Sequence, residues 1–121
     1  MIYNQNNIFA KILRGEIPCK KIFEDDFVLS FYDINPQKKI HALVIPKGKY
    51  IDLDDFNEKA SPNEIVGLLK GISIVAKKLK ISVDTGKGYR ALANISEDGG
   101  QEVPHLHFHL FGGEKIGKMV S

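Results

Sequence analysis

Three histidines occupy alternate positions near the end of the chain, and this alternation constrains the fold more than any other feature. The run reads His-Leu-His-Phe-His-Leu-Phe from residue 105 to residue 111. Successive side chains of a β-strand point to opposite faces of its sheet, so the run predicts a strand with two different faces. One face carries imidazoles that are close enough to act on one bound group, such as a phosphate. The other face is apolar and predicts burial of Leu106, Phe108 and Leu110.

Two other interpretations of this run follow from the residues alone. Histidines can lie on a solvated strand face without a function. Three imidazoles and a water molecule are also a known coordination of catalytic zinc, so a metal site is an alternative. A zinc site would require carboxylate or backbone groups that orient the ligand rings, and purified protein would then contain stoichiometric metal.

The composition is that of an ordinary globular protein and predicts one domain over residues 1–121. A formal net charge of +2, from 17 basic and 15 acidic residues, argues against a surface built to bind nucleic acid. Cys19 is the only cysteine, which rules out an intrachain disulfide and fits a reducing compartment. The first residues lack the pattern of a secretion signal, and no later stretch is long enough to span a bilayer. We therefore expect a cytoplasmic protein that does not associate with membranes.

Local patterns predict two helices and five strands. Asn7 can cap a short helix that Gly15 ends, and Ser61, Pro62 and Glu64 form a capping box before a long apolar stripe that continues to Leu79. The predicted strands are Lys21–Glu24, Val28–Asp33, Ile40–Ile45, Tyr89–Asn94 and the histidine run. The region from Ile51 to Ser61 is expected to be a longer loop.

Short links between the strands favour an α+β fold, with a five-stranded antiparallel sheet, one main helix and one short N-terminal helix. The main helix would cover one face of the sheet, and a ligand would bind on the other. The link from Ile95 to Pro104 is longer than a hairpin requires and contains Asp98-Gly99-Gly100. It predicts either a plain turn or a loop that presents backbone N–H groups to a ligand.

The histidine run, with Gly99-Gly100-Gln101-Glu102-Val103 before it, resembles the His-x-His-x-His-x-x signature of the histidine triad (HIT) superfamily. The first half of the chain resembles the Hint branch, the histidine triad nucleotide-binding proteins. The segments that carry this second resemblance are Ile8–Ile12, Gly15–Pro18, Phe23–Asp26, Phe31–Pro36 and His41–Lys47.

The resemblance implies an HIT-like fold and a homodimer whose two sheets join into one ten-stranded sheet. It also implies binding of a purine nucleotide of the AMP or GMP type and hydrolysis of nucleoside 5′-phosphoramidates through a nucleotidyl-histidine intermediate. Dinucleoside polyphosphate hydrolases and nucleotidyl transferases of the same superfamily share the triad, so these activities are alternatives. A non-catalytic nucleotide-binding or interaction module is a third.

By matching positions, the resemblance makes His107 the nucleophile, with His105, His109 and His41 around it. Asn94 would lie near the scissile phosphate, and Asp33 would hold the ribose. The base pocket would be lined by Ile8, Phe9, Ile12, Phe31 and Ile34.

These residue types suit the chemistry without a cofactor. An imidazole titrates near neutral pH, so a large fraction of His107 would be an uncharged nucleophile, and crowding by other imidazoles favours that form. His105 and His109 are candidate proton donors to phosphoryl oxygens. Asn94 and backbone N–H groups near Gln101 and Glu102 can stabilise negative charge without a metal.

The chain departs from the pattern of many animal members of the branch at three positions. Glu102 replaces a serine, and Pro104 replaces the tyrosine that precedes the triad, so a hydroxyl contact is absent. Lys49 stands where a further histidine often occurs. The tail also ends soon after Met119, so it predicts nothing about acceptor specificity.

Overall fold

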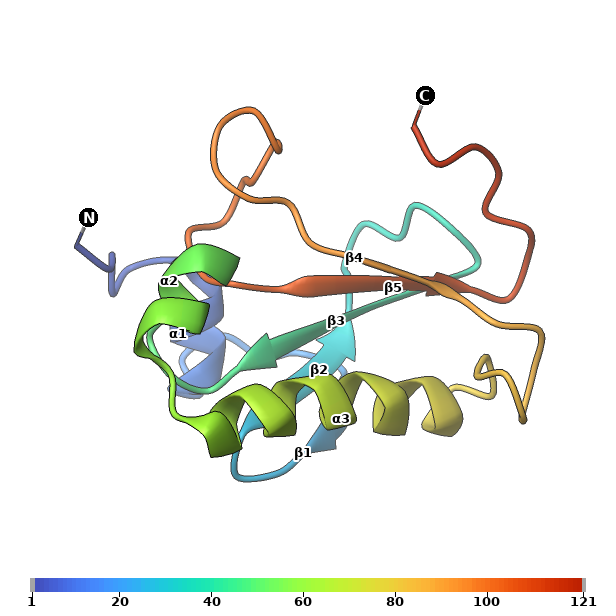
Figure 1. The fold of residues 1–121 in the computed structure, drawn as a ribbon, viewed down its shortest axis with the longest axis horizontal. Helices are drawn as coiled ribbons and strands as arrows, with labels where there is room; N and C mark the ends of the chain where they lie inside the picture. The colour runs from blue at the N-terminus through green and yellow to red at the C-terminus, as the bar shows by residue number, and fades with distance from the viewer. Residues whose placement is uncertain (1, 121) are drawn as a thin grey trace.

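The computed structural model describes residues 2–120, which form a five-stranded antiparallel sheet in the order β1-β2-β3-β5-β4. The strands are β1 (Lys21–Glu24), β2 (Val28–Tyr32), β3 (Ile40–Pro46), β4 (Arg90–Leu92) and β5 (Phe108–Gly112). The predicted fold class is therefore confirmed. Because β5 pairs with both β3 and β4, the end of the histidine run lies inside the sheet, beside His41 of β3 (Figure 1).

The long helix α3 (Pro62–Lys78) begins with the predicted capping box. The hydroxyl of Ser61 accepts from the Glu64 N–H, and the Glu64 carboxylate accepts from the Ser61 N–H. The buried stripe of α3 packs on Val28, Val44 and Leu110 of the sheet. A Cβ at Gly71 would lie 2.9 Å from a methyl group of Val28, so glycine permits this close approach. Leu106, Leu110 and, in part, Phe108 contact the same core, which confirms the apolar face of the histidine run.

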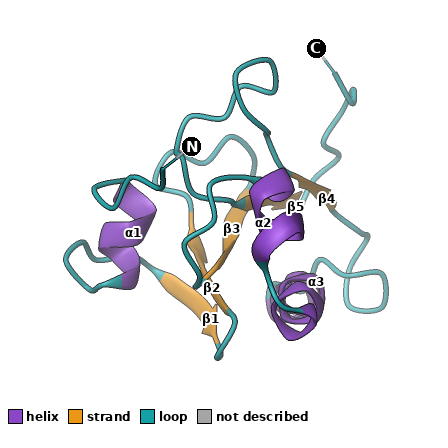
Figure 2. Cartoon of the chain, turned by 60° about the vertical axis from the view of Figure 1, so that its left-hand side comes forward, coloured by secondary structure: helices purple, strands orange, loops and turns teal. Residues whose placement is uncertain are grey.

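The sequence suggested that the opposite face of the sheet is open. In the structure it is only partly open, because the short helix α1 (Ile8–Leu13) covers part of it. The Asn7 side chain accepts from the Ala10 N–H and caps the helix. Phe9 then packs with Leu29, Phe31, Leu43 and Ile45 in a second buried cluster. Figure 2 shows α1 and α3 on opposite sides of the sheet. The uncovered remainder of the α1 face holds the candidate site.

Several element boundaries differ from the expectations. A third helix, α2 (Leu53–Lys59), occupies the region that was expected to be a loop, and Asp52 caps it. β4 is shorter than predicted because it pairs only with β5, from Arg90 to Leu92. β5 starts at Phe108 because the backbone before it bonds elsewhere: the N–H of Leu106 donates to the Tyr50 carbonyl. Only His109 of the three histidines thus lies in a strand.

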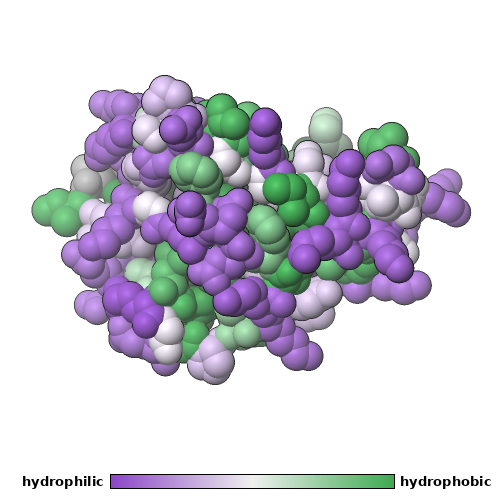
Figure 3. Space-filling view, turned by 90° about the horizontal axis from the view of Figure 1, so that it is seen from below, coloured by the Kyte–Doolittle hydropathy of each residue, from purple (hydrophilic) through white to green (hydrophobic). Residues whose placement is uncertain are grey.

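The face of the molecule seen from below Figure 1 is mainly polar (Figure 3). In Figure 3, which views the molecule from below Figure 1, hydrophilic side chains surround separate apolar groups. Val66, Leu69 and Ile74 of α3 are among the exposed apolar residues. No helix among residues 2–120 is both long enough and apolar enough to cross a membrane.

Candidate functional site

A cavity of about 470 Å³ opens beside the histidines, between β3, β5, α1 and the 93–107 connection. It contains seven of the residues that the sequence singled out: Phe9, Asp33, His41, Asn94, Glu102, His107 and His109. It also contains five residues to which the sequence assigned no individual role, although Gly100 lies in the loop expected to present N–H groups to a ligand: Asn35, Gln37, Leu43, Gly100 and Val103. Two strands, one helix and two loops therefore bring most of the candidate polar groups to one place.

The ring of His107 points its Nδ1 toward the backbone two residues earlier in the chain. Its Nδ1 lies 2.7 Å from the carbonyl oxygen of His105. A carbonyl only accepts, so Nδ1 carries the proton in the neutral ring and Nε2 keeps its lone pair. Phe9 contacts the ring edge to face, with centroids 4.9 Å apart. The local backbone thus fixes the tautomer that leaves a lone pair on Nε2.

His105 lies apart from the cavity and is completely buried. Its Nε2 donates to the Pro46 carbonyl at 2.9 Å, and its Nδ1 accepts from the Tyr3 hydroxyl at 2.5 Å. Both ring nitrogens are therefore engaged with protein groups. Donation from His105 to a phosphoryl oxygen, as the sequence analysis expected, would require breaking one of these bonds.

The four imidazoles form a row in the order His105, His107, His109 and His41. At the end of this row away from His105, His41 and His109 form a hydrogen-bonded pair. The backbone N–H of Gln37 donates to His41 Nδ1 at 3.1 Å, so the proton of the neutral ring lies on Nε2. That Nε2 is 2.9 Å from His109 Nδ1 and donates to it. His109 must then carry its own proton on Nε2. Asp33 supports the pair, with a carboxylate oxygen 3.5 Å from His41 Nε2.

Burial holds all four imidazoles in the neutral form. Burial is the main cause that lowers the pKa of His105 to about 4; the bond to the Pro46 carbonyl opposes this shift, and the nearby His107 ring adds to it. Burial is also the main cause that lowers the pKa of His109 to about 4, and the neighbouring His107 and His41 rings contribute smaller shifts in the same direction. Burial also lowers the pKa of His107 and of His41, while the Asp33 carboxylate opposes the shift at both. The cavity is therefore lined by uncharged imidazole rings and by two carboxylates, Asp33 and Glu102.

The zinc alternative does not fit this arrangement. The three triad rings cannot share one metal, because both nitrogens of His105 are occupied within the protein. Asp33, His41 and His109 do place possible ligand atoms within 4.8 Å of one another. However, a metal at His41 Nε2 needs the lone pair of that nitrogen, and the Gln37 N–H fixes the proton there. The donor set is organised for hydrogen bonding.

Of the other polar residues that the sequence predicted, Asn94 and Glu102 line the cavity, and Gln101 holds the neighbouring backbone in place. Asn94 lines the cavity and donates to the Gly99 carbonyl at 2.7 Å. Gln101 does not line it; its side chain donates to the carbonyls of Ile51 and Val103 and accepts from the Ser96 N–H. Gln101 therefore ties the 93–107 connection to the segment before α2. Glu102 lines the cavity and raises the pKa of His107 slightly through its charge.

Of the five residues expected to form the base pocket, only Phe9 lines the cavity. Phe31 is buried beneath Phe9, with ring centroids 5.7 Å apart, and Ile12 packs against the same cluster. Ile8 is 40% exposed and Ile34 is 86% exposed, so both are open to solvent. Asp33 lines the cavity, where one of its oxygens also accepts from the Asn35 N–H.

Three contacts that orient the imidazoles or set their tautomers were not predicted from the sequence. Tyr3 bonds to His105 across 102 residues, and the backbone of Gln37 sets the His41 tautomer. Phe111, two residues after the triad, stacks on His109 with an angle of 2° between the rings. The alternation of the run placed Phe111 on the histidine face, and this signal would have identified it. No comparable signal existed for Tyr3 or Gln37.

Comparisons with known proteins agree on one family. The HIT domain model matches residues 14–116. An uncharacterized 13.2 kDa HIT-like protein of Azospirillum brasilense is 51% identical over 119 residues, which cover 98% of this chain and 95% of that protein. The structure of a HIT family hydrolase from Clostridium thermocellum has a TM-score of 0.86 and 34% identity, and the match covers 98% of this chain and 99% of that one. A histidine triad nucleotide-binding protein from Candida albicans has a TM-score of 0.76 and 33% identity, over 87% and 73% of the respective chains.

Proposed function

Because this chain belongs to the HIT domain family, we propose that it hydrolyses nucleoside 5′-phosphoramidates through a nucleotidyl intermediate on His107. The observation that carries the proposal is the His107 tautomer. The bond from Nδ1–H to the His105 carbonyl leaves a lone pair on Nε2, in a neutral ring that lines the cavity. A neutral imidazole with a fixed lone pair is a competent nucleophile at neutral pH.

In the first step, His107 Nε2 attacks the α-phosphorus, a P–N bond to the ring forms, and the P–N bond to the amine breaks. The departing amine must gain a proton. The substrate brings this proton on its phosphoramidate group, and the Nε2–H of His109, which stays on the neutral ring, can donate a hydrogen bond to a phosphoryl oxygen. In the second step, water attacks phosphorus and the bond to His107 breaks. The products are a nucleoside monophosphate, a free amine and the restored imidazole.

Other groups that line the cavity suit the phosphate, the ribose and the base of a nucleotide. The Asn94 amide lines the cavity and can stabilise charge on the phosphoryl oxygens, whereas the backbone N–H groups of Gly100 and Gln101 already donate to the Glu97 and Ser96 carbonyls. Asp33 offers acceptors to ribose hydroxyls. Phe9 provides an apolar surface beside His107 for a purine base. A relative named as a histidine triad nucleotide-binding protein and another named as a HIT family hydrolase support this assignment.

We further infer that the protein belongs to the Hint branch and acts as a cytoplasmic homodimer. In the described part of the chain, β4 has β5 as its one partner, so its other edge can pair with β4 of a second copy. Such pairing would produce a continuous ten-stranded sheet. Sedimentation at micromolar concentration tests this inference.

Turnover of an adenosine 5′-phosphoramidate with a fluorescent amine tests the proposed function. Wild-type protein should release the amine, and His107→Asn should abolish release while AMP binding, measured by calorimetry, is retained. A diadenosine polyphosphate and a nucleotidyl acceptor assayed in parallel distinguish the other HIT reactions, and binding without any turnover would indicate a non-catalytic module. Turnover by His107→Asn at the wild-type rate would contradict the assignment.

A further inference from the structure

Tyr3 contacts the histidine row, although nothing in the proposed reaction uses it. Its hydroxyl donates to His105 Nδ1 at 2.5 Å, and the two rings meet edge to face with centroids 5.6 Å apart. His105 is completely buried, so water cannot replace the hydroxyl without a rearrangement of the chain. The first residues of the chain thus reach the imidazoles by a specific contact.

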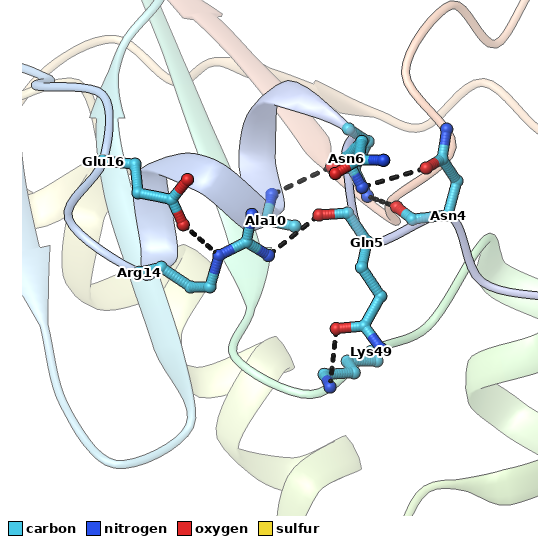
Figure 4. A network of polar contacts seen from close by, with 8 residues as sticks. Asn4, Gln5, Asn6, Ala10, Arg14, Glu16 and Lys49 are labelled. Carbon is cyan, nitrogen blue, oxygen red and sulfur yellow. Dashed lines mark hydrogen bonds and ion pairs between the residues drawn. The ribbon is translucent and has the colours of Figure 1, made fainter.

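The segment that carries Tyr3 is held in place by its own polar network, shown in Figure 4. The Arg14 guanidinium donates to the Gln5 carbonyl at 2.8 Å, and the Lys49 ammonium donates to the Gln5 side-chain oxygen at 3.0 Å. The Asn4 side chain accepts from the Asn6 N–H. These bonds fix the backbone from residue 4 to residue 6, directly beside Tyr3.

Tyr3 and Pro46 together allow only one state of His105. The Pro46 carbonyl requires a proton on Nε2, and the Tyr3 hydroxyl donates to an Nδ1 that has none. The ring is therefore anchored at both nitrogens. The carbonyl of the same residue accepts the Nδ1–H of His107 at 2.7 Å. A displacement of the His105 ring that also shifts its backbone would move the carbonyl that sets the tautomer of His107.

We propose that Tyr3 is a positioning residue for His107: it anchors the His105 ring, and through it the carbonyl that holds the lone pair of His107 on Nε2. The kinetic consequence rests on the proposed function, whereas the structural consequence does not. Tyr3 touches neither the cavity nor the reacting atoms. Its effect is on the orientation and protonation pattern of the rings.

Tyr3→Phe tests this proposal because it removes the hydroxyl and keeps the ring. Tyr50→Phe is the matched control, since Tyr50 also loses one partly buried hydrogen bond, to Glu64 at 2.7 Å, away from the imidazoles. Long-range ¹H–¹⁵N spectra of the histidine rings report which nitrogen carries the proton. In the wild type and in Tyr50→Phe we expect His105 protonated on Nε2 and His107 protonated on Nδ1.

In Tyr3→Phe we expect His105 to keep its proton on Nε2, where Pro46 accepts it, but the signal of its unbonded Nδ1 to shift and the His107 Nδ1–H signal to broaden or shift. With a phosphoramidate substrate, kcat should fall roughly tenfold, the usual size for loss of a group that orients an imidazole, while KM stays within about twofold. Tyr50→Phe should change neither value. A His105 ring protonated on Nδ1 in the wild type, or identical ring spectra in Tyr3→Phe and Tyr50→Phe, would overturn the proposal. Absence of turnover by the wild type would overturn the proposed function alone.

Discussion

His105 and His109 lie at opposite ends of the same alternating run, and their surroundings differ. His105 has no exposed surface and is bonded at both nitrogens to Tyr3 and Pro46. His109 lines the cavity, and only its Nδ1 has a protein partner among the described residues. Residues with the same spacing and chemistry thus occupy a fully bonded, buried position and a position that lines the cavity. The comparison teaches that burial and hydrogen-bond partners, which spacing does not specify, decide what each imidazole can do.

The largest expected effect is on catalysis at the open end of the row. His109→Ala removes an N–H group that can donate to the phosphoryl oxygens, so we expect kcat to fall about 10²- to 10³-fold. Stability should fall by only about 1 kcal/mol, because the residue is partly exposed and loses one hydrogen bond. Steady-state kinetics and urea unfolding of the same preparation measure both. An unchanged kcat would remove His109 from the mechanism.

The next effect is on stability at the buried end. His105→Ala leaves a cavity and two unpaired groups, the Tyr3 hydroxyl and the Pro46 carbonyl, so we expect the free energy of unfolding to fall by about 3 kcal/mol. Urea unfolding at pH 7.5 measures it. If His105→Ala were as stable as His109→Ala, the two ends of the row would not differ as described.

Acid should weaken the fold through the same buried ring. The pKa of His105 is about 4 in the folded protein and near 6.5 when unfolded, so the unfolded state binds more protons between these values. Stability is therefore greatest above pH 6.5 and falls as the pH drops toward 4. From pH 6.5 to pH 5, this one imidazole should cost about 2 kcal/mol. Urea unfolding across this range measures the slope, and a constant free energy would contradict the pKa shift.

The smallest effect concerns Asp33, which lies near the open end. Its carboxylate raises the pKa of His107, so Asp33→Asn lowers that pKa and keeps the nucleophile neutral at lower pH. The acid limb of kcat/KM should move to lower pH, because this ratio reports the free enzyme. A limb that stays in place, or moves upward, would show that Asp33 does not influence the nucleophile.

Much of this arrangement could be predicted because it depends on local patterns. The alternation separated the apolar residues from the histidines, and the Ser61 to Glu64 pattern fixed the start of α3. The resemblance supplied most of the residues that line the cavity. α2 was missed because it is seven residues long and buries a single residue, Phe56, so it has almost no apolar stripe.

The roles of the individual rings could not be predicted, because they depend on contacts between distant parts of the chain. His105 is anchored by groups 102 and 59 residues away, and one of these is a backbone carbonyl. The tautomer of His41 depends on the backbone N–H of Gln37. Nearly every residue has a backbone N–H and a carbonyl, so the residue type does not reveal such partners. The sequence therefore placed all four histidines at one site, whereas the structure shows that His41, His107 and His109 line the cavity and His105 lies apart from it.

Mapping a covalent intermediate tests the central claim most directly. Wild-type protein should be mixed with an adenosine 5′-phosphoramidate, quenched within the first turnover under conditions that preserve phosphoramidate bonds, and analysed by peptide mass spectrometry. We expect an adenylyl group on the peptide that contains residues 105–111, localised to His107 by fragmentation and absent from His107→Asn. An adenylyl group on His105, His109 or any other residue, or rapid turnover with no adduct, would contradict the account.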